Sequence, residues 1–104
     1  MRVNKSVVKF EWDEGNIGKN KKHNVEDKES EEVFFDGDKV ILKDVLHSDK
    51  EERFIILGKT KKSRLLYVVF TKRGKKISEV FLRIRIISAR DINKKEVQLY
   101  EKAT

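Results

Sequence analysis

Residues 65–70 read Leu-Leu-Tyr-Val-Val-Phe, six apolar or aromatic residues in a row without polar alternation. A short run of this kind is typical of a central strand that is covered on both faces of a sheet. Further runs rich in Val, Ile, Leu and Phe lie at 39–45, 53–57 and 81–88, separated by polar, charged or glycine-containing turns. These four segments predict an antiparallel sheet, and a short strand expected at 7–12 would add a fifth member.

Helical patterns flank the predicted strands. Asp13 is a suitable N-cap for a helix that runs to about Lys22, although Gly15 and Gly18 weaken it. Asn24 is expected to end this helix, because asparagine tolerates the left-handed conformation that a C-cap requires.

Two more helices are predicted, one on each side of the strand-rich region. The first covers about 26–35, has an acidic outer face, and stops at the turn signal Asp36-Gly37-Asp38. The second covers about 92–102, with Asp91 as its expected N-cap. A strand, two helices, a series of strands and a final helix predict an α+β fold, and 104 residues fit a single domain over 1–104.

The composition argues against several classes of protein. No run of about 20 apolar residues is present to span a bilayer, and the chain turns acidic before a signal sequence could develop, so a cytoplasmic protein without membrane contact is expected. With no cysteine, and with His23 and His47 at no familiar ligand spacing, neither a metal site nor a cofactor is predicted.

The charge is distributed unevenly along the chain. Residues 1–53 carry 11 Lys and Arg against 14 Asp and Glu, a net charge of −3, whereas residues 54–104 carry 14 against 4, a net charge of +10. A basic half that also holds the strongest strands indicates a polyanionic partner such as nucleic acid. The alternative is that these charges serve only to keep a small lysine-rich protein in solution.

Two arginines share one face of the last predicted strand. Side chains alternate along a strand, so Arg83 and Arg85 point one way, and Leu82, Ile84 and Ile86 point the other. A guanidinium group binds phosphate through two parallel hydrogen bonds and stays charged at any relevant pH, so this pair is a candidate anion site. The alternative is a pair of surface salt bridges to Glu79 or to the acidic helix.

Other charged residues are weaker candidates. His23 suits proton transfer because its ordinary pKa lies near neutrality, and the adjacent Lys22 could hold RNA, but a histidine at a helix end also serves as a cap or dipole partner. Arg90 is expected near the N-terminus of the last helix, where anions bind, or else to be a solvated loop residue. Glu52 and Arg53 lie at the start of a strand, where either could simply pair with a neighbouring charge.

Three aromatic side chains could stack on bases, but packing in the core is the better interpretation for them. They are Phe10, Trp12 and Phe34.

Taken together, several motifs resemble the ordered landmarks of the BrnT family of ribonuclease toxins. The resemblance covers about residues 8–102, and its most specific parts are FEWD at 10–13, KHNV at 22–25 and RIISAR at 85–90, followed by a helix with Glu96 and Tyr100. Further landmarks are Val33-Phe34-Phe35-Asp36, Asp44, His47-Ser48, Glu51-Glu52-Arg53 and Gly58.

This resemblance implies a RelE-like α+β fold and a metal-independent endoribonuclease that blocks growth by suppressing translation. It also implies neutralisation by a ribbon-helix-helix antitoxin, with operator DNA bound only by the toxin–antitoxin complex. The implied catalytic residues are His23 for proton transfer, with Arg53 and Arg85 for phosphate and transition-state charge. Residues implied to bind RNA are Lys22, Glu52 and Arg90, to which the strand pattern adds Arg83.

Two departures from the family pattern are visible. Asn24 stands where the family usually has glycine, a tolerable replacement in a left-handed cap. The segment 75–83 also looks longer than expected, which affects the surroundings of Arg83. The alternative function is a non-catalytic module that binds nucleic acid or a partner; a purely structural protein would leave the arginine pair and the charge asymmetry unexplained.

Overall fold

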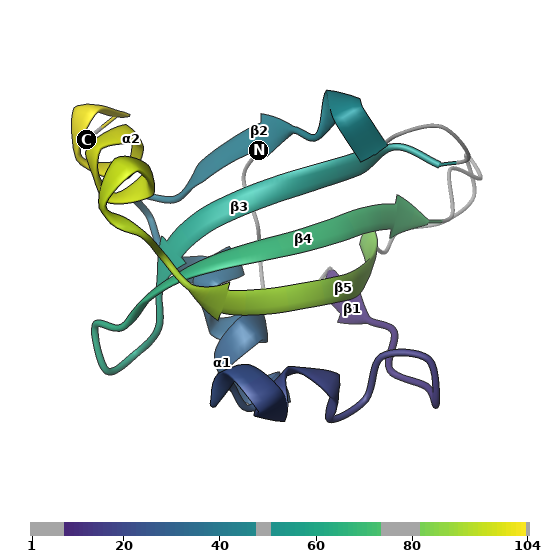
Figure 1. Ribbon diagram of the computed structural model, residues 1–104. Helices are drawn as coiled ribbons and strands as arrows, with labels where there is room; N and C mark the ends of the chain where they lie inside the picture. Colours follow the sequence, from purple (N-terminus) through teal and green to yellow (C-terminus); the bar gives the residue numbers. More distant parts are fainter. Residues whose placement is uncertain (1–7, 48–50, 74–81, 104) are drawn as a thin grey trace.

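The computed structural model describes residues 8–47, 51–73 and 82–103 and shows an α+β fold built on one five-stranded sheet (Figure 1). Its strand order is β1-β5-β4-β3-β2, which places β4 at the centre, as the apolar run at 65–70 predicts. The strands are β1 (Val8–Phe10), β2 (Val40–Lys43), β3 (Arg53–Lys59), β4 (Leu65–Arg73) and β5 (Leu82–Asp91).

The sheet is mixed, so the prediction of a purely antiparallel sheet was wrong in one pair. Strands β2 to β5 form an antiparallel meander, but β1 pairs in parallel with β5. The local sequence pattern predicts that a segment forms a strand, but it does not show which strand pairs with it. Here the chain leaves β1, runs past the helices and enters the sheet again at the opposite edge, which leaves β1 beside the last strand.

The described residues form two α-helices, α1 (Asp27–Glu32) and α2 (Lys94–Ala103), and not the three predicted. The predicted helix from Asp13 to Lys22 is replaced by turns and a short 3-10 helix, η1 (Lys19–His23). Gly18 adopts a left-handed conformation with φ of 68°, which interrupts any continuous helix at that point. The expected left-handed cap at Asn24 is confirmed, with φ of 59°.

The other two helical predictions are confirmed, with one change of cap. The segment predicted at 26–35 is α1 continued by a 3-10 helix, η2 (Val33–Phe35). Asp91 belongs to β5, so it does not cap α2. Asn93 does, since its side chain accepts from the Glu96 N–H while the Glu96 carboxylate accepts from the Asn93 N–H. A third short 3-10 helix, η3 (Val45–His47), follows β2.

One face of the sheet forms the core against α1 and η2, which lie behind β4 and β5 in Figure 1. Alternate residues of the central strand, Leu66, Val68 and Phe70, have no exposed surface. The Phe34 ring packs edge-on against the rings of Phe70 and Phe10, with ring centroids 4.9 Å and 5.3 Å apart, respectively. Core packing of Phe10, Phe34 and Trp12 is therefore confirmed.

The opposite face is covered by α2 at the end where β3 and β5 finish (Figure 1). At its other end, β3 and β5 begin and β4 ends, so this end holds the predicted arginine pair. Residues 74–81, which include Glu79 and most of the extended 75–83 segment, lie outside the described residues. In the part of the chain that the structure describes, no helix is long and apolar enough to cross a membrane.

Two asparagines complete the edge of β5 beyond the short strand β1. The Asn16 amide donates to the carbonyl of Ile86 at 3.0 Å, and Asn20 Oδ1 accepts from the Ala89 N–H at 2.9 Å. Both asparagines are 2% exposed. A buried backbone group needs a hydrogen-bond partner, and these side chains supply the partners that a neighbouring strand would otherwise provide. They also attach the turns at 13–23 to the sheet.

Candidate functional site

Three residues in register across the sheet bring two of the predicted site residues together. Thr71 of β4 lies opposite Arg53 of β3 on one side and opposite Arg85 of β5 on the other. Directly opposed residues project from the same face, and strands lie about 4.8 Å apart, so the two arginine backbones are roughly 10 Å apart. Two arginine side chains at that spacing can reach one phosphate group.

Arg85 already binds a carboxylate. Its Nη1 and Nη2 atoms donate to the two carboxylate oxygens of Asp13 at 2.6 and 3.0 Å. This hydrogen-bonded pair, with the charges of Glu11 and Glu51, holds the pKa of Arg85 above its ordinary value. The guanidinium is therefore permanently charged and oriented, two properties that an anion-binding group requires.

Two other predicted residues, Arg83 and Glu52, lie at this end of the sheet. Arg83 is exposed and lies two residues before Arg85, on the same face of β5. Glu52 is exposed and directly precedes the first residue of β3, Arg53. Arg53, Arg83 and Arg85 thus lie on the sheet face opposite the core, at the end where β3 and β5 begin, and Glu52 adjoins them in the chain.

His23 and Lys22 lie elsewhere. Both are exposed at the end of η1. The His23 carbonyl accepts from Arg64 Nη2 at 3.5 Å, and Arg64 Nε donates to Asp91 at 2.7 Å, so His23 lies beside the last residue of β5. A strand rises about 3.3 Å per residue, which places Asp91 roughly 20 Å from Arg85. The structure therefore does not bring His23 and Arg85 together.

Arg90 lies at the same distant end, beside α2. It forms a two-pronged ion pair with Glu96, at 2.9 and 2.8 Å, and its guanidinium lies 3.9 Å from the centre of the Tyr67 ring. The hydrogen bonds to Glu96 raise the pKa of Arg90. Arg90 does lie at the first turn of α2, as expected, but its contact there is with a carboxylate.

Comparison with protein families gives a match over most of the chain. A family model described as the ribonuclease toxin, BrnT, of type II toxin-antitoxin systems matches residues 12–96, most of the chain. This chain belongs to the BrnT family. No curated protein sequence gives a match. Family membership indicates a ribonuclease toxin of a type II system, with an RNA target and an antitoxin partner.

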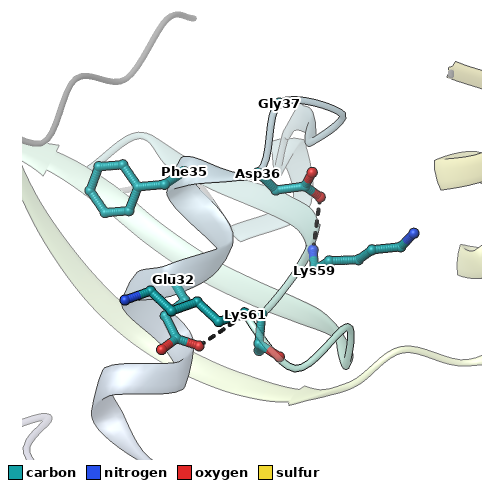
Figure 2. A pocket seen from close by; sticks show the side chains of 7 residues that line it. Glu32, Phe35, Asp36, Gly37, Lys59 and Lys61 are labelled. Carbon is teal, nitrogen blue, oxygen red and sulfur yellow. Dashed lines mark hydrogen bonds between the residues drawn. The ribbon is translucent and has the colours of Figure 1, made fainter.

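A pocket of about 480 Å³ in this BrnT-family toxin lies where η2 meets the end of β3 (Figure 2). None of the residues predicted for the site lines it. Its lining residues are Glu32, Phe35, Asp36, Gly37, Lys59, Thr60 and Lys61. In the part of the chain that the structure describes, no group of three or more His, Asp or Glu side chains is placed to hold a metal ion.

Asp36, beside this pocket, attaches α2 to the rest of the toxin. Its carboxylate accepts hydrogen bonds from the Tyr100 hydroxyl at 2.7 Å and from the Lys59 N–H at 2.8 Å, the latter drawn in Figure 2. Burial raises the pKa of Asp36, but hydrogen bonds from the Asp38 N–H, the Tyr100 hydroxyl and the Lys59 N–H together lower it by more, so the pKa lies below its usual value. Burial, and then Asp36, raise the pKa of Tyr100.

These two shifts predict how stability depends on pH. Asp36 contributes stability above its unfolded pKa, about 3.9, and that contribution is lost as pH falls through its lower folded pKa. The Tyr100 hydroxyl contributes its full stability below its unfolded pKa, about 10. That contribution is lost as pH rises through its higher folded pKa. Tyr100→Phe is therefore expected to reduce the free energy of unfolding by about 1–2 kcal/mol at pH 7. Urea unfolding at pH 3, 7 and 11 checks this, and a deficit of equal size at all three pH values would contradict it.

Sequence reasoning missed several residues that shape the site. The predicted helix makes Asp13 its N-cap and includes Asn16, whereas both side chains bond to β5. Thr71, 1% exposed, was seen only as part of a strand. One available signal was the Asp-x-Gly-Asn order at 13–16, which is typical of a turn in which the Asp side chain bonds to the backbone.

Proposed function

We propose that this chain is an endoribonuclease that cleaves RNA without a metal ion, through attack of a 2′-hydroxyl on the adjacent phosphate. The observation that supports the proposal most directly is the register Arg53–Thr71–Arg85, which puts two arginines on one sheet face within reach of one phosphate. Family membership supports the reaction class. We also propose a RelE-like architecture and one toxin domain over 1–104.

The reaction needs charge stabilisation and two proton transfers. A base accepts the 2′-hydroxyl proton, the 2′-oxygen bonds to phosphorus, and the bond to the 5′-oxygen breaks as that oxygen gains a proton. The products carry a 2′,3′-cyclic phosphate and a 5′-hydroxyl. Arg53 and Arg85 stabilise the extra negative charge on the five-coordinate phosphorus, and Arg83 binds a neighbouring phosphate.

The base is assigned by position. His23 lies at the far end of β5, so it cannot contact the phosphate that Arg85 holds in this arrangement. Glu51 is half-buried, and its charge acts on Arg85. We therefore assign proton acceptance from the 2′-hydroxyl to Glu51, and RNA binding to the adjacent Glu52. We assign binding of the RNA backbone, further along the sheet, to His23, Lys22 and Arg90.

Two single variants separate this assignment from the catalytic role expected of His23. Glu51→Gln is expected to lower kcat, whereas His23→Ala is expected to raise KM with little change in kcat. The reverse pattern would restore His23 as the proton-transfer residue.

The antitoxin partner is assigned by analogy with the family. We propose a ribbon-helix-helix antitoxin, with operator DNA bound by the toxin–antitoxin complex and not by the toxin alone. A gel-shift assay with operator DNA, using toxin, antitoxin and the complex, tests this; a shift by the toxin alone would contradict it.

Cleavage is tested with purified protein and total RNA in excess EDTA, with and without ribosomes. Fragments that carry 5′-hydroxyl and cyclic phosphate ends are expected. If RNA stays intact in both mixtures but binds with steep salt dependence, the chain is instead a non-catalytic nucleic-acid-binding module.

A further inference from the structure

A short loop that follows β1, residues 13–16, lies against the end of the Arg85 guanidinium. Its first residue, Asp13, binds both Nη atoms, and the Asp13 carboxylate also accepts from the Gly15 N–H at 2.8 Å. The last residue of the loop, Asn16, accepts from the Asp13 N–H at 2.8 Å and donates to the Ile86 carbonyl. The loop is therefore fixed to the strand at the residue next to Arg85.

Gly15 lies directly against the arginine. A Cβ atom built at this position would lie 2.6 Å from Arg85 Nη2 and 3.0 Å from Asp13 Oδ1. The first distance is shorter than a real contact of this kind, so even a methyl group at residue 15 would displace the guanidinium. The backbone conformation of Gly15 is not left-handed, so alanine meets no backbone obstacle there.

The ion pair uses only one edge of the guanidinium. Arginine has five N–H donors in one plane, and Asp13 engages the end formed by Nη1 and Nη2. The Nε–H and the second N–H of Nη2 form a separate edge that matches two oxygens of a phosphate. Arg85 keeps 17% of its side-chain surface exposed.

We propose that Asp13 and Gly15 are positioning residues for Arg85: the carboxylate holds the end of the guanidinium, the bare glycine leaves room for it, and the Nε edge is presented to the RNA phosphate. This inference rests on the proposed ribonuclease function, since it explains how one of its two cations is held. Asp13 and Gly15 act through Arg85 and make no contact with the reacting atoms.

The first test compares two glycine-to-alanine changes. Gly15→Ala is expected to lower kcat/KM for RNA cleavage by about tenfold to a hundredfold, because displacing a catalytic group by about 1 Å can cost that much. Gly37→Ala is the matched control, since a Cβ atom there meets nothing within 4 Å. Urea unfolding of both variants shows whether either has lost stability.

The second test is a double-mutant cycle. Asp13→Asn is expected to lower kcat/KM by about tenfold in the otherwise unchanged chain and to have no further effect in a chain that carries Arg85→Ala, because residues that act together are not additive. Nitrogen NMR of the guanidinium provides a readout independent of cleavage. Separate Nη signals of Arg85 are expected in the unchanged protein and in Gly37→Ala, and averaged signals in Gly15→Ala and Asp13→Asn.

The outcomes separate this inference from the function on which it rests. If Arg85→Ala cleaves RNA as fast as the unchanged protein, the proposed role of Arg85 is wrong. If Arg85→Ala is inactive but Gly15→Ala matches Gly37→Ala in rate and in its NMR signals, only the positioning role is overturned. Additive effects of Asp13→Asn and Arg85→Ala would overturn it as well.

Discussion

Arg85→Ala is expected to lower the rate of RNA cleavage by about 10²–10³-fold, the usual cost of removing one group that stabilises transition-state charge. Arg85 lies in register with Thr71 and Arg53 on the sheet face opposite the core, and its guanidinium is already oriented by Asp13. Arg85→Lys is expected to recover only part of the rate, because a lysine ammonium cannot form two parallel hydrogen bonds to one carboxylate or phosphate.

The measurement is a single-turnover cleavage assay on a defined RNA, paired with growth of cells that express each variant. Lys95→Ala, an exposed cation on α2, is the matched control and should cleave at the original rate. Asp13 is 61% exposed, so the loss of its partner should change the free energy of unfolding little. Growth arrest by Arg85→Ala as complete as that caused by the unchanged toxin would contradict the assignment.

Among the glycines that the structure describes, Gly58 is expected to be the one where substitution by alanine is most destabilising. A Cβ atom at residue 58 would lie 2.9 Å from both the Cβ atom and the carbonyl oxygen of Val33, and Val33 is fully buried in η2. Since a backbone atom cannot swing aside as an exposed side chain can, β3 and η2 must separate. Overpacking of a core contact costs typically about 1–3 kcal/mol.

Thermal unfolding checks this expectation. At about 4–8 °C per kcal/mol for a chain of this size, a cost of about 1–3 kcal/mol should lower the melting temperature by roughly 4–24 °C. Gly37→Ala, with open space around the new methyl group, should stay within about 0.5 kcal/mol of the original protein. Equal melting temperatures for the two variants would show that the contact between Gly58 and Val33 can relax.

Local pattern was sufficient for most of the secondary structure. Period-two runs and turn residues located the five strands to within a few residues, and the apolar run at 65–70 identified the central one. The aromatic residues of the core and the left-handed cap at Asn24 also followed from residue type alone. These features depend on side-chain period and backbone preference, which neighbouring residues in the chain determine.

The prediction of a helix at 13–22 was wrong because residues in this segment form hydrogen bonds with residues far away in the chain. Asp13 looks like an N-cap, yet its carboxylate binds Arg85, 72 positions away, and Asn16 bonds to Ile86, 70 positions away. Gly18 then adopts a left-handed conformation. Contacts of this length override local helix preference, and no spacing within the segment shows them.

The chain sequence by itself determined the residue types available for RNA chemistry, the basic second half and the family to which the chain belongs. Only the tertiary structure decided which of those residues lie close together. Strand register aligned Arg53 with Arg85 across Thr71, and the length of β5 separated His23 from both. The physical reason is that register and strand order depend on pairing between segments far apart in the chain, whereas composition and local period do not.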